Sequence, residues 1–158
     1  MAACGRFVRL IRTKGRQARF VEFLRALCTN DGKAMRANQW RVCRFFITDA
    51  RELHVKLHLK DEGTPNERVM VSADAQYFPA FVGSAELEVC EWLDSTSAET
   101  KAYFEQCVAV YEVLVQGRNL KNTPPMQELL PYNVVTALIT HRRLRRHRQD
   151  HGAATLLG

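Results

Sequence analysis

The sequence contains no long hydrophobic run. Its apolar stretches are short, and the one at 134–139 is interrupted by Thr136. A helix needs about 20 consecutive, mostly apolar residues to cross a membrane. We therefore expect no membrane span in this chain, which by itself would form no pore.

Cysteine is present only as 5 residues, an odd number, and no two of them are spaced as Cys-X-X-Cys. A secreted disulfide framework uses an even number of cysteines at regular spacings. Cys28, Cys90 and Cys107 instead lie among apolar neighbours, where a free cysteine behaves as a small hydrophobic residue. The pattern favours a reducing compartment.

Glycine is sparse as well, and Gly15, Gly32, Gly63 and Gly83 stand apart from one another. A phosphate-binding loop needs several closely spaced glycines at the start of a helix. The sequence therefore lacks the loop that would hold a nucleotide, and we expect no cofactor.

What is present is the composition of an ordinary globular protein, with 46% apolar and 25% charged residues among 158. This length suits one domain with a single core. We predict one helical domain over residues 1–149, with a β insertion at about 53–93, followed by a flexible tail at 150–158.

The positive charge is gathered at the two ends of the chain. The net charge is +6, yet the residues between the two terminal clusters are net acidic. The first cluster comprises Arg6, Arg9, Arg12, Lys14, Arg16 and Arg19, and the second comprises Arg142, Arg143, Arg145, Arg146 and Arg148.

The second cluster has two interpretations. It could bind the phosphates of nucleic acid, an inositol phosphate or an anionic lipid. It could also be a solvated helix end, whose cations favour the negative pole of the helix dipole. No aromatic residues are interleaved with the arginines and no nucleic-acid-binding fold is recognisable, which favours the solvated end.

Apolar residues follow a helical period in the first third of the chain. A short amphipathic helix is predicted at residues 7–11 and ends near Gly15, and 29–32 has turn chemistry. A third helix should open at about 35–38. The second helix carries a stripe of Phe20, Phe23, Leu24, Leu27 and Cys28, and the third carries Trp40, Val42, Phe45 and Phe46.

In the middle of the chain, apolar residues recur at every second position. Val55, Leu57 and Leu59 alternate with His54, Lys56 and His58, which predicts a half-buried strand. Residues 61–66 read as a loop and 68–71 as a returning strand. Leu87, Val89 and Trp92 suggest a third strand.

Helical patterns return after residue 96. Ser97 is a plausible N-cap, Gly117 sits where a helix would end, and Pro124 with Pro125 marks a new start. The buried face should consist of Phe104, Cys107, Val108, Tyr111 and Leu114, and a final helix after Pro131 should bury Val134, Val135 and Leu138. Successive amphipathic helices with short links suit an α-solenoid.

Several of these segments resemble the inositol trisphosphate and ryanodine receptor homology (RIH) domain, with the inositol trisphosphate receptor the nearer relative. The segments are 7–12, 19–28 with the polar turn at Gly32, Asn38–Gln39, the acidic Trp-bearing stretch 88–94, 103–114, 117–119 and 126–130. The resemblance implies a mainly α fold, an armadillo-like α-solenoid segment with a small β-hairpin insertion. It implies no ligand-binding residue here, because the family's basic ligand cluster has no counterpart in this chain.

The resemblance also implies a function. The chain would be a non-catalytic segment of an intracellular ligand-gated calcium-release channel at the cytosolic face of the endoplasmic reticulum. It would relay inositol trisphosphate binding to the pore, and its partners would be other segments or subunits of a tetrameric channel. A second hypothesis is a free-standing, cytoplasmic armadillo-like adaptor whose Arg-rich C-terminal helix binds nucleic acid or acidic partners. A third is a hydrolase with an unrecognised site.

Candidate chemical sites are weak by comparison. His54 and His58 share a strand face, but their spacing matches no standard zinc pattern and Lys56 lies between them, so we expect a solvent-facing strand edge and no metal. The carboxylate pairs Asp61/Glu62 and Glu86/Glu88 come with no apolar pocket or nucleophile motif. We predict that the chain is not an enzyme.

Overall fold

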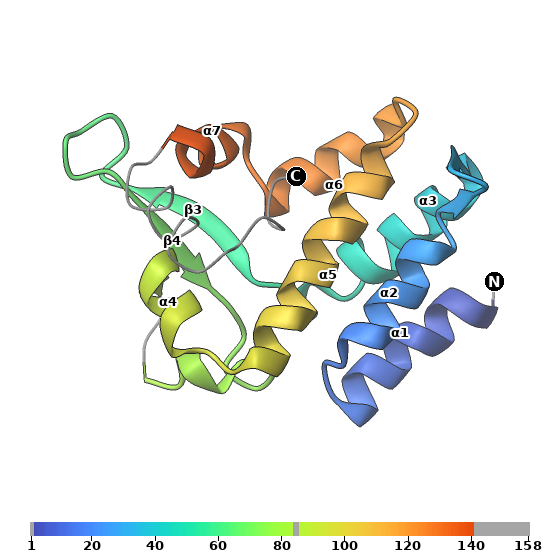
Figure 1. Ribbon diagram of the computed structural model, residues 1–158, viewed down its shortest axis with the longest axis horizontal. Helices are drawn as coiled ribbons and strands as arrows, with labels where there is room; N and C mark the ends of the chain where they lie inside the picture. The colour runs from blue at the N-terminus through green and yellow to red at the C-terminus, as the bar shows by residue number, and fades with distance from the viewer. Residues whose placement is uncertain (1, 84–85, 141–158) are drawn as a thin grey trace.

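The computed structural model describes residues 2–83 and 86–140 (Figure 1). Most of these residues are helical, which confirms the predicted mainly α class, and two small antiparallel sheets interrupt the helices. The α-helices are α1 (Ala2–Lys14), α2 (Ala18–Ala26), α3 (Arg36–Val42), α4 (Val89–Ser95), α5 (Ala98–Val115), α6 (Thr123–Leu129) and α7 (Tyr132–Thr140).

The helix predicted from the first aromatic stripe is α2, but its buried face is rotated from the prediction. Val21, Leu24 and Cys28 are fully buried, whereas Phe23 is 40% exposed. Phe23 stacks on Phe7 of the neighbouring α1, with ring centroids 3.9 Å apart. The rings therefore join the two helices near the surface, and smaller side chains of α2 pack inward, towards α5.

The predicted turn after α2 belongs to a short β-hairpin with a two-residue loop. Strand β1 (Thr29–Asn30) pairs with β2 (Lys33–Ala34) in antiparallel register. Asp31 and Gly32 between them have φ values of 48° and 73°. Two central residues with positive φ match the right-handed twist of a hairpin, and Asp-Gly is a favoured pair for this turn.

The predicted third helix is α3, and it runs directly into a π-helix, η1 (Cys43–Thr48), followed by a short 3-10 turn, η2 (Arg51–Leu53). π-Helices are rare and widen the helical turn by one residue. Phe46 and Ile47 of η1 are buried, while Trp40 of α3 is 45% exposed.

The predicted hairpin insertion is confirmed. Strand β3 (Lys56–Lys60) pairs with β4 (Arg68–Ser72), and β4 pairs with the two-residue strand β5 (Leu87–Glu88), all antiparallel. The register places Leu57 opposite Val71, and both are buried. Helix α7 contacts β3 and β4, and α4 contacts β4 and β5 (Figure 1).

The third strand ends at Glu88, so the prediction that it extends to Trp92 is wrong. Val89 and Trp92 lie on α4, where a separation of three residues puts both on one buried face. Trp92 is fully buried and meets the ring of Phe104 edge-on at 5.2 Å. This packing favours the helix, because a strand would place the two side chains on opposite faces.

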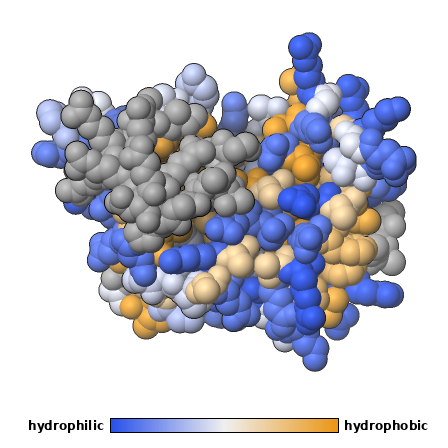
Figure 2. Space-filling model, in the orientation of Figure 1, coloured by the Kyte–Doolittle hydropathy of each residue, from blue (hydrophilic) through white to orange (hydrophobic). Residues whose placement is uncertain are grey.

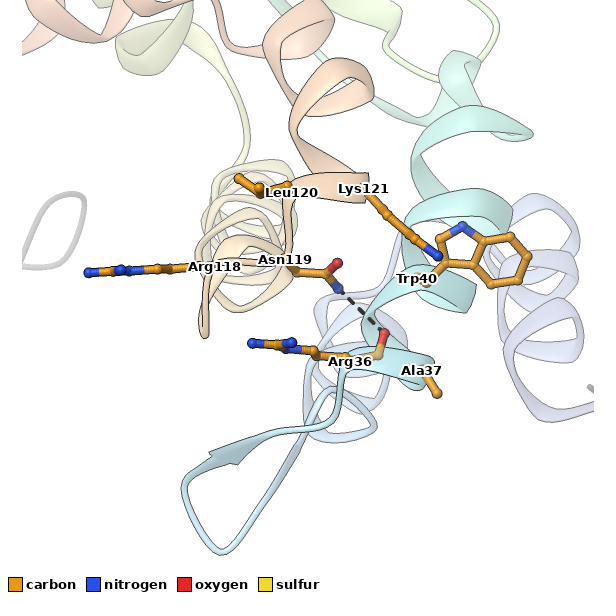
Figure 3. A pocket seen from close by; sticks show the side chains of 7 residues that line it. All are labelled: Arg36, Ala37, Trp40, Arg118, Asn119, Leu120 and Lys121. Carbon is orange, nitrogen blue, oxygen red and sulfur yellow. Dashed lines mark hydrogen bonds between the residues drawn. The ribbon is translucent and has the colours of Figure 1, made fainter.

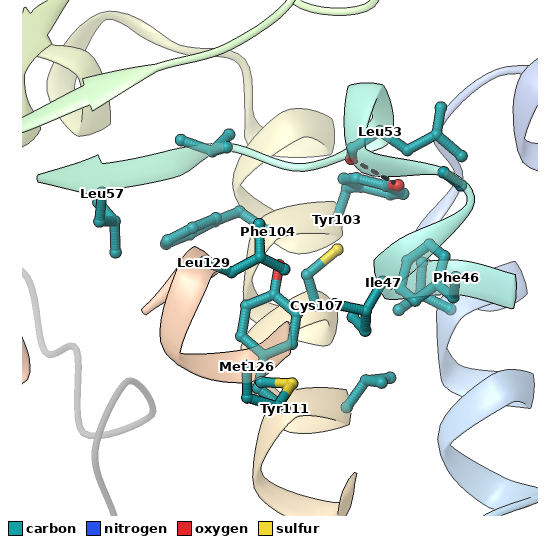
Figure 4. Close-up of a cluster of buried hydrophobic side chains, with 14 of the residues drawn as sticks. Phe46, Ile47, Leu53, Leu57, Tyr103, Phe104, Cys107, Tyr111, Met126 and Leu129 are labelled. Carbon is teal, nitrogen blue, oxygen red and sulfur yellow. Dashed lines mark hydrogen bonds between the residues drawn. The ribbon is translucent and has the colours of Figure 1, made fainter. Parts of the chain in front are cut away.

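Helix α5 is the centre of the core (Figure 4). Ser97 caps it as predicted, because its Oγ accepts a hydrogen bond from the Thr100 N–H at 3.2 Å. Gly117 follows its end with a φ of 72°. Val108 is only half-buried, contrary to the prediction. The buried side chains of α5 are Tyr103, Phe104, Cys107, Val110, Tyr111 and Leu114.

The last described helices follow a short 3-10 turn, η4 (Leu120–Asn122). Pro124 and Pro125 lie at the start of α6, where a missing N–H costs nothing. Val134 of α7 is buried as predicted, together with Ala137, whereas Val135 and Leu138 are half-buried. Hydrophilic residues cover much of the face in Figure 2, and hydrophobic residues show between them in separate places.

Candidate functional site

The predicted anion-binding patch lies in a part of the chain that the structure does not describe. Arg142, Arg143, Arg145, Arg146 and Arg148 lie outside the described residues, as does the predicted tail at 150–158.

The prediction that His54 faces solvent is wrong. His54 precedes β3 and is 1% exposed, between η1 and α5. Its Nε2 lies 2.8 Å from the carbonyl oxygen of Phe46, and its Nδ1 lies 2.7 Å from the hydroxyl of Tyr111. Nε2–H therefore donates to the carbonyl, and Nδ1 accepts from the hydroxyl. Burial lowers the pKa of His54 to about 4, so the ring is neutral at pH 7.

The other predicted histidine lies on the sheet. His58 Nε2 is 2.9 Å from Glu86 Oε2, and Lys60 donates to the other oxygen of the same carboxylate. These hydrogen bonds lower the pKa of Glu86. His54 and His58 thus have separate partners and do not meet at one site. Within residues 2–83 and 86–140, no group of three or more His, Cys, Asp or Glu side chains is placed to hold a metal ion.

The two carboxylate pairs weighed as weak acid–base candidates lie in the loop between β3 and β4 and at strand β5. Asp61 and Glu62 are exposed in the loop between β3 and β4, and Glu62 accepts a hydrogen bond from Asn133 of α7 at 2.8 Å. Glu86 is occupied by its two basic neighbours. Neither pair lines either of the two pockets described next.

A pocket of about 470 Å³ lies between the start of α3 and the turn after α5 (Figure 3). We call it the basic pocket, because three of its lining residues are cationic and none is acidic. In the view of Figure 3, Arg36 and Arg118 extend in the same direction, and Lys121 reaches towards Trp40. Its lining comprises Arg36, Ala37, Trp40, Arg118, Asn119, Leu120 and Lys121.

The basic pocket combines charge with exposed apolar surface. Trp40 is 45% exposed and Leu120 is 78% exposed, so the pocket presents two large apolar side chains to solvent. The guanidinium of Arg44 lies 5.8 Å from the Trp40 ring centroid and covers part of the indole. Arg118 and Lys121 take part in none of the ion pairs that the structure shows within residues 2–83 and 86–140.

A set of polar side chains holds the base of this pocket, and we call it the polar clamp (Arg36, Gln39, Asn119 and Asn122). Gln39, which is fully buried, donates from Nε2 to the carbonyl oxygens of Val113 at 2.7 Å and Gln116 at 3.1 Å. The Asn119 amide donates to Gln39 Oε1 at 3.0 Å. The clamp thereby connects α3 to the end of α5.

The polar clamp satisfies the carbonyl groups that a helix C-terminus leaves without partners. Asn122 Nδ2 donates to the Leu114 carbonyl at 2.8 Å, and Arg36 Nη2 donates to the Gly117 carbonyl at 3.0 Å. Gly117 also approaches β2 closely, because a Cβ atom added there would lie 3.0 Å from the Cβ of Ala34. The hairpin, α3 and the end of α5 are therefore packed as one unit.

A second pocket of about 410 Å³ lies where the α1–α2 turn meets the start of α5. Arg16 lies there with its guanidinium 4.2 Å from the centroid of the Phe78 ring. Its Nη1 is buried without a hydrogen-bond partner, and burial lowers the pKa of the group. Glu99 also lines this pocket, which reduces its attraction for an anion.

Sequence reasoning missed both the basic pocket and the polar clamp. The signal that was available is the pair of polar segments, Asn38–Gln39 and Gly117–Asn119, which both contribute to the resemblance. They meet in space although 80 positions separate Gln39 from Asn119. A single sequence contains no information that would pair them.

Comparison with known proteins supports the resemblance in the N-terminal part. A search of curated proteins finds no match to this chain. No helix within the described residues is long and apolar enough to cross a membrane. The family model of the RIH domain matches residues 2–56, roughly a third of the chain, and these residues comprise α1, α2, β1, β2, α3, η1 and η2. The predicted relationship to the RIH domain is thereby confirmed over this segment.

Proposed function

We propose that this chain is a non-catalytic segment of an intracellular ligand-gated calcium-release channel. In this role it relays inositol trisphosphate binding to the pore and scaffolds contacts between subunits. The observation that carries the proposal is the RIH-domain match over residues 2–56, since that domain belongs to the receptors of this channel family. The proposal places the chain at the cytosolic face of the endoplasmic reticulum.

The packing of the helices suits such a relay. Helix α2 packs against α5, and the polar clamp connects α3 to the C-terminal end of α5. A displacement of the RIH-matching helices would therefore move α5 with them. Coupling between distant sites is carried by packed elements that shift as rigid bodies between discrete arrangements.

The proposal includes the architecture around this segment. Residues 1–149 would form a single RIH-like domain within an armadillo-like α-solenoid, and 150–158 would be its flexible tail. Neighbouring segments would then stack on the helical faces of this domain. In a channel of this kind the partners are other segments and the other subunits of a tetramer.

The relay is tested by calcium release from microsomes that carry the channel. Gln39→Ala removes two hydrogen bonds between α3 and α5, so it should loosen the coupling between ligand site and pore. The concentration of inositol trisphosphate that gives half-maximal release should shift by roughly three-fold to ten-fold, with an unchanged single-channel conductance. The matched control is Gln127→Ala at an exposed position of α6.

An unchanged ligand dependence for Gln39→Ala would argue against the relay. If the chain instead bound nucleic acid with a steep salt dependence, the adaptor hypothesis would replace it. Turnover of a substrate that one carboxylate substitution abolishes would favour the hydrolase hypothesis.

A further inference from the structure

We propose that the basic pocket is a docking site for a partner protein segment that is rich in carboxylates and carries one large apolar side chain. This inference goes beyond the relay and does not depend on it. It rests on the charge of the pocket, on its exposed apolar residues and on the rigidity of its base.

The charge of the pocket selects an acidic partner. Arg36, Arg118 and Lys121 come from three different elements, namely α3, the turn after α5 and η4. All three are exposed, and no carboxylate lines the pocket beside them. Several cations gathered around one concavity raise the local positive potential and favour an acidic segment.

The exposed apolar surface of the pocket favours a partner that carries an apolar side chain in addition to its carboxylates. Leu120 stands between Arg118 and Lys121 in the sequence and is 78% exposed, and Trp40 offers part of its indole on the far side of the pocket. Aromatic residues and arginines are the residue types that most often dominate the energetics of protein interfaces. An aliphatic or aromatic side chain of the partner would cover Leu120 and Trp40 together.

This combination distinguishes a protein segment from a phosphate compound. A free inositol phosphate or a lipid headgroup would use the three cations but would leave Leu120 and the indole in water. A nucleic acid would stack a base on the indole but would leave Leu120 in water. A segment with an apolar side chain between carboxylates would contact both kinds of surface. The exposed leucine therefore favours the protein partner over the other anions.

The base of the pocket is already ordered for binding. Asn119 is buried and bonded to Gln39, and Arg36 donates to the Gly117 carbonyl at 3.0 Å. Bonds of this kind fix the backbone from which Arg118 and Leu120 project. A pre-ordered surface loses less conformational entropy on binding than a flexible one.

The test uses the full chain and a short fluorescently labelled peptide in which glutamates flank a single central phenylalanine. Two control peptides replace the glutamates by glutamine, or the phenylalanine by serine. Binding is followed by fluorescence anisotropy of the peptide. The NMR signals of the indole N–H groups of Trp40 and Trp92 are recorded in parallel. We expect the parent peptide to bind about ten-fold more tightly than either control and to shift the Trp40 signal alone, since Trp92 is fully buried.

Variants then locate the site. The double variant Arg118→Glu with Lys121→Glu should weaken binding about ten-fold, and Leu120→Ser should weaken it several-fold. Both changes lie at exposed positions, so the fold should persist, which the Trp92 signal reports. The matched control is Arg9→Glu with Lys56→Glu, two exposed cations outside the pocket that should leave the affinity within about two-fold.

The proposal would be overturned if the serine peptide bound as well as the parent, because the apolar contact would then play no part. It would also be overturned if the peptide left Trp40 unaffected up to millimolar concentrations. Phosphatidylserine vesicles or single-stranded RNA that bound more tightly than the peptide, with the same loss in the double variant, would reassign the pocket to phosphate recognition.

Discussion

His54 illustrates how one residue links the stability of this fold to pH. It is buried between the carbonyl of Phe46 and the hydroxyl of Tyr111, and both contacts suit the neutral ring. Protonation would place a charge in the core and would remove the acceptor that the Tyr111 hydroxyl uses. The residue therefore ties η1 to α5 only while it is uncharged.

We predict that the free energy of unfolding falls as the pH drops below neutral. The pKa of His54 is about 4 in the folded protein, below an unfolded value of about 6.5, so the unfolded chain binds the proton more readily. The His54 contribution is complete above pH 6.5 and is lost progressively towards pH 4. Between pH 7 and pH 5 the loss should be roughly 2 kcal/mol, measured by urea unfolding.

Two variants isolate the contribution of His54 to this pH dependence. His54→Gln cannot titrate, so its stability should change less between pH 7 and pH 5 than that of the parent. Gln127→Ala alters an exposed side chain of α6 that does not titrate and should keep the parental dependence. An equally steep loss in His54→Gln would assign the effect to other groups.

A second residue-scale prediction compares two neighbouring positions of α2. Leu24 is fully buried and Phe23 is 40% exposed. Leu24→Asp would bury an unpaired charge and should lower the free energy of unfolding by roughly 4 kcal/mol, or prevent folding. Phe23→Asp should cost about 1 kcal/mol, mainly through the lost stacking on Phe7. Equal effects in thermal unfolding would contradict the observed face of α2.

At the scale of elements, the sequence predicts best those features whose structure depends only on neighbouring residues. The Ser97 cap, the helix end at Gly117 and the turn within 29–32 depend on a few adjacent residues, and each is found as expected. Long amphipathic stripes also predict helices correctly. These features need no information about distant parts of the chain.

The wrong predictions concern segments whose structure depends on packing against elements far away in the sequence. Apolar residues at 87, 89 and 92 fit a strand or a helix, and the contact of Trp92 with Phe104 favours the helix. The alternation of polar and apolar residues at 54–59 predicts a solvent-facing strand position for His54, which is buried. Its partner Tyr111 lies 57 positions away, beyond the reach of a local pattern.

The polar clamp gives an element-scale prediction. Gln39→Leu replaces a buried amide that donates to two carbonyl groups of α5 and accepts from Asn119, so it leaves buried polar groups without partners. The variant should lose about 2 to 4 kcal/mol of stability in urea unfolding. Gln127→Leu at an exposed position of α6 is the matched control and should change stability by less than about 0.5 kcal/mol.

Hydrogen exchange gives a second readout of the clamp. Amides in the last turn of α5 should exchange faster in Gln39→Leu, whereas those of α7 should not change. Uniform changes over both helices would mean that Gln39 acts through global stability and does not specifically hold α3 to α5.

At the scale of the whole molecule, the described helices form one connected core. The RIH-matching N-terminal segment, α5 and the small sheet share it, so they should unfold together. The basic pocket lies at the edge of this core, where α3 and the end of α5 present charge and apolar surface to a partner. A channel segment would use the core for coupling and such surfaces for contacts with its neighbours.

The most direct test of the proposed channel role is to measure the size of the native protein and to identify the proteins bound to it. An antibody against the chain would be used on a size-resolved blot of endoplasmic-reticulum membranes, and the captured material would be analysed by mass spectrometry. We predict a product far larger than 18.1 kDa, together with peptides of a calcium-release channel. A soluble product near 18.1 kDa without channel peptides would contradict it and would favour the adaptor.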